Sequence, residues 1–189
     1  KISEDKKDLG KIENISCDCI CVSGFWTPTI HLASQSGNKT KFNEDIDAFV
    51  PDKSKQRETT LGSANGIFTL EETLKTSFEA GHEISKKITN NDNKISVPQV
   101  YEKKYAQHDK FWCVPLPKKK KYKRFLDFQN DVVVTDVELA LREGYRSIEH
   151  VKRYTTLGMA TDQGKTSNLN GLQLVSNFEN KIVPAVGHT

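Results

Sequence analysis

The chain has few residues of the kinds that form catalytic or metal centres. Its 189 residues include four cysteines and five histidines, and no cysteine follows Cys113. His82 and Glu83 are not followed by a second histidine four residues on, which excludes the helical zinc motif. Asp127 and Asp131 are more typical of turn and cap residues than of an acid/base pair. Since no serine or cysteine has a recognisable nucleophile motif, we assign no catalytic residue and no metal ligand.

Long apolar runs are also lacking. The longest candidate, Ile15 to Trp26, is short and carries Asp18, which argues against a membrane span or a signal peptide. Cys17, Cys19 and Cys21 alternate along it, so on a strand they share one face rather than surrounding an ion. The sequence predicts a strand from Ser16 to Ser23, buried on both faces. Its thiols then act as small apolar side chains in a reducing, cytoplasmic compartment.

Positive charge is concentrated in one segment. The chain has a net charge of +3, but Tyr101 to Arg124 holds nine basic and two acidic residues, which is +7. The run Lys118 to Arg124 could contact nucleic acid as part of a stand-alone basic module, because clustered cations displace counterions from phosphates. Pro115 and Pro117 favour a solvated connector instead. We therefore expect neither nucleic acid nor a membrane as a partner.

The first half of the chain has a weak nucleotide-binding pattern. Phe42 to Pro51 predicts a hairpin, and Thr59 to Ile84 predicts a passage from strand to helix. In that passage Leu61 to Gly66 is a turn of small residues, and Thr69 with Glu72 forms a capping box. A helix that begins behind such a turn offers N–H groups to a phosphate or ribose. The Gly-x-Gly-x-x-Gly turn that cradles a pyrophosphate is absent from the sequence.

The second half predicts three short helices. Thr135 with Glu138 forms a capping box for the first, Gly144 ends it, and Ser147 begins the second. The third follows a polar loop and carries an apolar stripe of Leu169, Leu172 and Val175. Thr161 or Asp162 could cap this third helix. Lys165 and the N–H groups beside it could then hold a phosphate or carboxylate, although a solvated lysine is the simpler interpretation.

Several segments resemble the alpha subunit of heterotetrameric sarcosine oxidase, in the same order. They are CDCICVSGFWTPTIHLASQSG, GSANGIFTLEETL, DFQNDV and EGYRSIEHVKRYTTLGMATDQGKTSN. The resemblance covers about residues 12 to 189 and implies an internal piece of that subunit. It implies that residues 1 to 88 are the end of a glutathione-reductase-like NAD-binding domain. The positions that match its NAD contacts are Gly62, Ile67 and Thr69.

Residues 125 to 189 resemble a second family, the bacterioferritin-associated ferredoxin-like domains that hold a [2Fe–2S] cluster with four cysteines. This chain has Asp127 to Asp131 where those domains have their first cysteine pair, and Thr161 to Lys165 where they have the second. Because thiolates are needed to hold the cluster, the fold is expected without it. The expected architecture is therefore α/β, with a partial nucleotide-binding domain, a basic linker at residues 89 to 124, and a small helical domain.

The first resemblance also implies a function. The parent enzyme would oxidise sarcosine to glycine, reduce O2 to H2O2 and pass the one-carbon unit to tetrahydrofolate, which binds a domain outside this chain. FAD and FMN would belong to the beta subunit, with FMN near Thr161 and Lys165, and the smaller subunits would complete a heterotetramer. The piece alone would be inactive. The alternative is the alpha subunit of a related amine dehydrogenase that acts on proline or opines.

Overall fold

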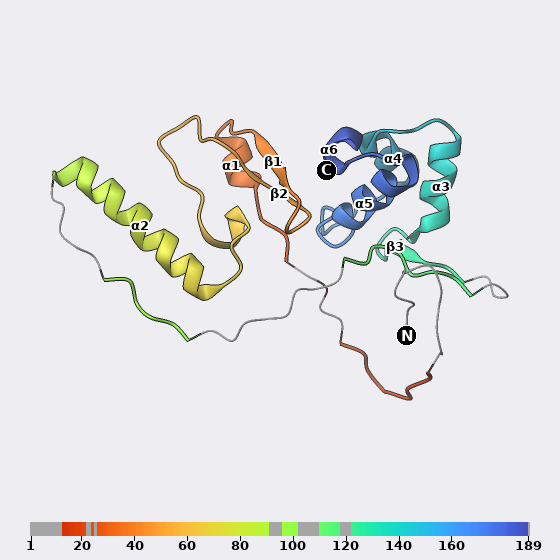
Figure 1. Ribbon diagram of the computed structural model, residues 1–189. Helices are drawn as coiled ribbons and strands as arrows, with labels where there is room; N and C mark the ends of the chain where they lie inside the picture. The colour runs from red at the N-terminus through yellow and green to blue at the C-terminus, as the bar shows by residue number, and fades with distance from the viewer. Residues whose placement is uncertain are drawn as a thin grey trace. The chain divides into compact units, whose positions relative to one another are not determined.

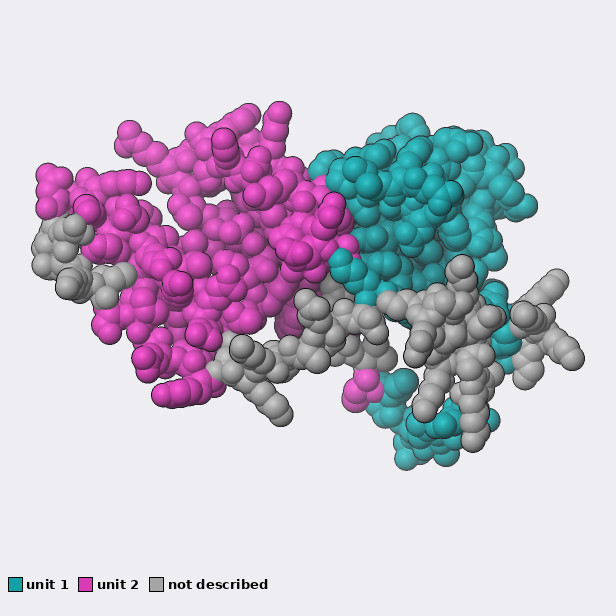
Figure 2. All heavy atoms as spheres, in the orientation of Figure 1, with its two compact units in different colours: residues 1–20, 108–189 teal, residues 21–107 magenta. Residues whose placement is uncertain are grey.

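The computed structural model describes residues 13–21, 24, 26–90, 96–101, 110–117 and 122–188. The chain forms a small mixed α/β structure that divides into two compact units (Figures 1 and 2). We call Cys21–Gln107 the hairpin unit, and Lys1–Ile20 with His108–Thr189 the helical unit. The connector around Trp112 is thus grouped with the helices. The expected domain boundaries at residues 88 and 124 stay predictions.

The strand expected from Ser16 to Ser23 is not formed in its described part, residues 16–21. That segment is non-helical and unpaired, and Cys17, Cys19 and Cys21 are exposed, so the prediction of a strand buried on both faces was wrong here. A strand needs a neighbour to bond its backbone groups, and none of the described residues supplies one. Trp26, which follows this segment, is 76% exposed. The turn expected around Asp8 lies outside the described residues.

The hairpin unit contains the hairpin that the sequence predicts. Strands β1 (Thr40–Asn43) and β2 (Ala48–Pro51) pair in antiparallel register, with Phe42 opposite Phe49. Their ring centroids lie 5.3 Å apart in an edge-to-face arrangement, which stabilises such cross-strand pairs. A short helix, α1 (His31–Gln35), precedes β1. Buried Asn38 follows α1, and its side chain donates to Glu58 over 2.6 Å and accepts from Lys55 N over 2.7 Å.

The expected passage from strand to helix keeps its turn and helix but lacks a strand at residues 59–61. A 3-10 turn, η1 (Gly62–Asn65), leads through Gly66 into the 20-residue helix α2 (Leu70–Thr89). A Cβ at Gly66 would lie 2.6 Å from Ile46 Cδ1, so the turn packs closely on the hairpin loop. All of α2 is described and none of its residues is buried. Its apolar face, which includes Leu70 and Phe78 at 53% and 37% exposure, is therefore only partly covered.

In the helical unit, a second hairpin precedes the helices. Its strands are β3 (Phe125–Asp127) and β4 (Val132–Val133). Four helices follow: α3 (Val134–Arg142), α4 (Ile148–Thr155), α5 (Asn168–Glu179) and α6 (Val183–Val186). The three helices that the sequence predicts are confirmed, and α6 was not predicted. Gly144 takes the expected positive φ of 96° after α3, and Ser147 stands at the start of α4. The two hairpins are antiparallel, and no parallel strand pair occurs in the described residues.

The capping box expected at Thr135 was wrong by two residues. Helix α3 has Val133 at its N-cap, and the Asp136 carboxylate accepts the Val133 N–H over 2.9 Å. The reason is that β4 runs directly into the helix, which leaves Thr135 within its first turn. A carboxylate in that turn also interacts favourably with the helix dipole.

The core of the helical unit lies around α5, which contacts α3, α4 and α6 (Figure 1). Six consecutive residues of α5, Gly171 to Ser176, are buried, so more than one full turn is covered on every side. Gly171 leaves no room for a side chain, because a Cβ there would lie 2.4 Å from Leu157 Cδ2. The fully buried apolar side chains of the unit include Val132, Val137, Ala140, Ile148, Val151, Leu157, Leu172, Leu174 and Val175.

Candidate functional site

The two polar segments singled out in the helical unit lie against each other. We call residues 127–131 and 156–167 the paired loops. At their centre is Asp127, which is 1% exposed. Its Oδ1 accepts the N–H groups of Gln129 and Asn130 over 2.9 and 3.2 Å. Its Oδ2 accepts the Gly158 N–H over 2.8 Å and the Ser167 hydroxyl over 3.5 Å. One buried carboxylate therefore binds both loops.

Further hydrogen bonds join the paired loops at their surface. Asn130 Nδ2 donates to the Thr156 carbonyl over 2.8 Å, and the Thr161 hydroxyl donates to Gln129 Oε1 over 2.7 Å. Asp131, expected as a possible partner of Asp127, is exposed and has a positive φ of 54°. Asp127 is thus the buried residue that joins the two loops, which we call the Asp127 clasp, and Asp131 is an exposed turn residue. Neither arrangement is that of an acid/base pair.

The loop around Thr161 does not cap the third helix, so that prediction was wrong. Helix α5 begins at Asn168, after turns that occupy residues 161–167. Asp162 instead closes its own loop by accepting the Gly164 N–H over 3.0 Å and the Thr166 hydroxyl over 2.6 Å. The hydrogen bond from the Thr166 side chain, followed by those from the Thr166 and Gly164 backbone, lowers the pKa of Asp162 below its ordinary value. Lys165 is exposed on this loop.

Asn168 fixes the end of the second loop. Its side chain fills the space beside Gly158 and Gly164, which both have positive φ. A Cβ at Gly158 would lie 1.9 Å from Asn168 Oδ1, and one at Gly164 would lie 2.3 Å from the same amide. Asn168 Oδ1 is buried and has no hydrogen-bond partner among the described residues. The two glycines are therefore required by a close approach as well as by their backbone conformation.

The expected NAD positions lie together at the start of α2. Gly62 is buried with φ of +60°, and a Cβ there would lie 3.2 Å from Thr73 Cγ2. The Ile67 N–H is already bonded to the Gly62 carbonyl over 3.1 Å. Thr69 stands at the N-cap as predicted, but its side chain makes no capping hydrogen bond in this fully described stretch. Acidic side chains in the first turn, Glu71 and Glu72, occupy the region where a phosphate would be favoured.

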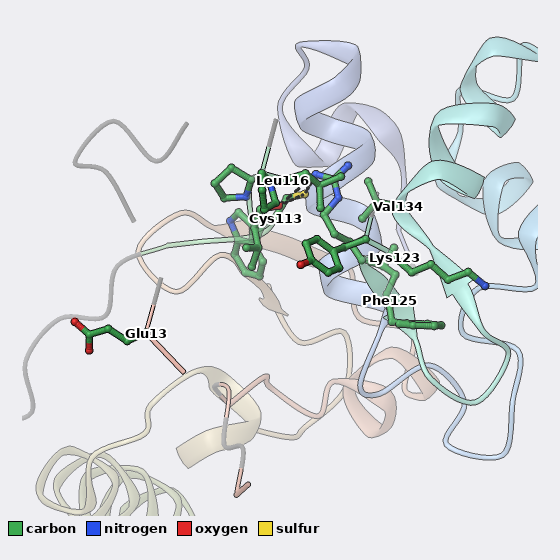
Figure 3. A pocket seen from close by; sticks show the side chains of 13 residues that line it. Glu13, Cys113, Leu116, Lys123, Phe125 and Val134 are labelled. Atoms are coloured by element: carbon green, nitrogen blue, oxygen red, sulfur yellow. Dashed lines mark hydrogen bonds between the residues drawn. The ribbon is translucent and has the colours of Figure 1, made fainter. Parts of the chain in front are cut away.

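The helical unit has an open cavity of about 620 Å³ (Figure 3). Residues 112–117 of the connector and the start of strand β3 both line it. Apolar side chains that include Trp112, Leu116 and Phe125 line it. At one wall Arg124 donates to Cys113 Sγ over 2.9 Å and lies 3.6 Å from Glu138. Burial raises the pKa of the Cys113 thiol despite the nearby arginine, so the thiol is a poor nucleophile at neutral pH.

Arg124 therefore fastens the connector to α3. The sequence had assigned this arginine to a solvated basic run, whereas in the structure it bonds to Cys113 and lies near Glu138. Most of the run, residues 118–121, lies outside the described residues.

The described residues contain no group of three His, Cys, Asp or Glu side chains placed to hold a metal ion. Within the same ranges, no helix is long and apolar enough to cross a bilayer.

Sequence reasoning singled out Asp127 to Asp131 and Thr161 to Lys165 but missed what joins the two loops. The burial of Asp127 has no local signature, because the Gly158 N–H and the Ser167 hydroxyl that it accepts lie 31 and 40 residues away. The sequence offers one signal: two glycines, Gly158 and Gly164, lie at either end of a polar stretch without proline.

Comparison with known proteins identifies relatives of nearly the whole chain. Residues 121–189 match the family described as the sarcosine oxidase A3 domain. The sarcosine oxidase subunit alpha of Rhizobium meliloti (strain 1021) is 34% identical over 181 residues, which is 95% of this chain. Those of Corynebacterium sp. strains P-1 and U-96 are 31% and 30% identical, over 93% and 92% of the chain. The chain spans only 18% of the length of each relative.

Proposed function

Because the chain belongs to the family of sarcosine oxidase alpha subunits, we propose that it is the part of such a subunit that holds NAD and contacts the flavin-bearing subunit. The single observation that carries this proposal is the similarity along more than nine-tenths of the chain. The parent enzyme would oxidise sarcosine to glycine with O2 and transfer the one-carbon unit to tetrahydrofolate, with FAD and FMN in the beta subunit. The described residues contribute binding and assembly rather than chemistry.

NAD would bind this chain at Gly62, Ile67 and Thr69. Gly62 is buried against Thr73, so its part would be to allow the compact turn that presents the start of α2 to the ligand. The residues fit only part of the dinucleotide. The Ile67 N–H is used within the turn, and Glu71 and Glu72 oppose an anion at the helix start. We therefore assign Thr69, which is exposed, to a ribose hydroxyl and leave the pyrophosphate to residues outside this chain.

Titration calorimetry tests this division. The 189-residue chain should give no saturable heat with NAD in the micromolar range, because half of the contacts are missing. The complete alpha subunit should retain NAD, and Thr69→Val should weaken that retention by about fivefold to tenfold, the loss of one hydrogen bond. A micromolar NAD site on the 189-residue chain, or an unaltered affinity in the T69V subunit, would contradict the assignment.

FMN would lie at the paired loops, with its phosphate beside Lys165. The exposed ammonium group of Lys165 fits this role, and Thr161 fits it less well because its hydroxyl hydrogen is already donated to Gln129. Lys165→Met should lower the FMN content of the assembled enzyme, whereas Lys152→Met on α4 should not. Equal FMN content in both variants, measured by absorbance after denaturation, would remove Lys165 from the site.

An iron–sulfur cluster does not fit the paired loops. The cluster needs thiolates, and the sequence has no cysteine beyond Cys113. The space between the loops is occupied by the Asp127 carboxylate and its donors. We expect anaerobic reconstitution with iron and sulfide to leave the chain colourless; a stoichiometric cluster would show that this expectation is wrong.

A further inference from the structure

Three large apolar side chains stand exposed on the paired loops and the strand before them. Phe128 at the tip of the β3–β4 hairpin is 79% exposed, Met159 after α4 is 59% exposed and Phe125 is 40% exposed. The rings of Phe125 and Phe128 are stacked, with centroids 5.7 Å apart. We call these three residues the Phe128 patch. Aromatic residues and methionine are enriched in protein interfaces, and a few well-packed anchor residues there carry most of the binding energy.

The backbone beneath the Phe128 patch is held in place. Phe128 directly follows Asp127, whose carboxylate accepts the next two N–H groups, and Met159 directly follows Gly158, which donates to the same carboxylate. Both apolar side chains thus project from segments that one buried group fixes. A preorganised surface of this kind loses little conformational entropy when a partner binds.

The charges around the Phe128 patch indicate the kind of partner. Lys123 Nζ lies 5.9 Å from the centroid of the Phe125 ring, and Lys165 is exposed on the second loop. Asp131 is exposed on the first loop, whereas Asp162 is bonded within its own loop. Of these exposed charges, two are lysines and one is an aspartate. A second copy of the chain is disfavoured, because a two-fold dimer would bring two surfaces with the same excess of positive charge together.

We propose that Phe128 inserts into an apolar pocket with an acidic rim on another subunit of the same oxidase complex. This rests on the proposed function, in which the chain is part of an alpha subunit. Phe125 supports the inserted ring from one side, and Met159 fills the edge of the pocket. Lys123 pairs with a carboxylate at its rim.

The test uses complete alpha subunit produced together with its neighbouring subunits. Phe128→Glu and Met159→Glu are compared with Ile182→Glu, a control at a 69% exposed residue of the same unit. Native mass spectrometry and size-exclusion chromatography report assembly, and circular dichroism reports folding. F128E should weaken assembly by about thirtyfold or more, and M159E by less, since truncating a central anchor typically has an effect of this size. I182E should assemble like the wild type.

The outcomes separate the two proposals. If the wild-type alpha subunit assembles but F128E assembles equally well, the docking proposal is wrong and the proposed function stands. Loss of a homodimer, rather than of a second subunit, would also overturn the docking proposal. If the wild-type alpha subunit recruits no other subunit, the proposed function itself fails.

Discussion

The Gly158 N–H donates to Asp127 Oδ2 over 2.8 Å and so joins the end of β3 to the segment after α4. Asp127→Asn keeps the size of the side chain but places an amide NH2 group where one oxygen now accepts. The variant should lose about 1–3 kcal/mol of the free energy of unfolding, the range for a hydrogen bond to a charged group and an unsatisfied buried donor. Urea denaturation followed by circular dichroism measures the change.

Asp131→Asn is the matched control for that substitution. Asp131 is exposed, and asparagine tolerates its positive φ, so stability should change by less than about 0.5 kcal/mol. If D127N and D131N have the same unfolding midpoint, the Asp127 clasp does not hold the loops.

The clasp illustrates what the sequence could and could not predict. Periodicity located α3, α4 and α5 because their apolar residues recur at helical spacing and are buried within the unit itself. The cap of α3 was placed at Thr135, because a Ser/Thr motif is visible in the sequence and the run of β4 into the helix at Val133 is not. The Asp127 donors come from two loops that are far apart in the sequence, which no local pattern records.

Gly158 and Gly144 allow a test of steric exclusion at two positions that both have positive φ. Both have positive φ, but a Cβ at Gly144 meets nothing within 4 Å, whereas one at Gly158 would lie 1.9 Å from Asn168 Oδ1. Gly144→Ala should cost about 1 kcal/mol for the left-handed backbone alone. Gly158→Ala should cost about 1–3 kcal/mol more, because Asn168 must move and the paired loops must shift with it.

Thermal unfolding of the two glycine variants provides the comparison. If G144A and G158A lose the same stability, the Asn168 side chain can move away from Gly158 and Gly164 without an energetic cost.

Glu179 gives the helical unit a dependence on acid pH. Lys181 Nζ lies 3.0 Å and Arg146 Nη1 lies 2.8 Å from its carboxylate. The hydrogen bond from Lys181, then that from Arg146, lowers the pKa of Glu179 below its ordinary value of 4.5. Because the folded pKa is lowered, the contribution to stability is complete above pH 4.5 and is lost as the pH falls toward the folded pKa. Glu179→Gln should remove this part of the acid sensitivity.

Melting temperatures across the range below pH 4.5 check that prediction, with exposed Glu143→Gln as the control. The wild type and E143Q should lose stability in parallel, and E179Q should show a shallower dependence. If the melting temperature of E179Q falls with pH as steeply as that of the wild type, the ion pairs of Glu179 with Arg146 and Lys181 do not contribute to the stability.

The first half of the chain shows a different limit of prediction. The hairpin was predicted correctly because Phe42 and Phe49 stabilise it locally. The strand expected at Ser16 to Ser23 and the apolar face of α2 would both need apolar neighbours for burial, and the described residues do not provide them. Sequence patterns indicate which surfaces are apolar, but they do not say which part of a protein covers them.

The proposed function is tested most directly by measuring which substrate the assembled enzyme oxidises. The complete alpha subunit, produced with its neighbouring subunits, should consume O2 and form H2O2 when sarcosine is added, with stoichiometric formation of glycine. Reduction of an artificial acceptor with proline or an opine, without sarcosine-dependent O2 uptake, would contradict the assignment and favour a related amine dehydrogenase.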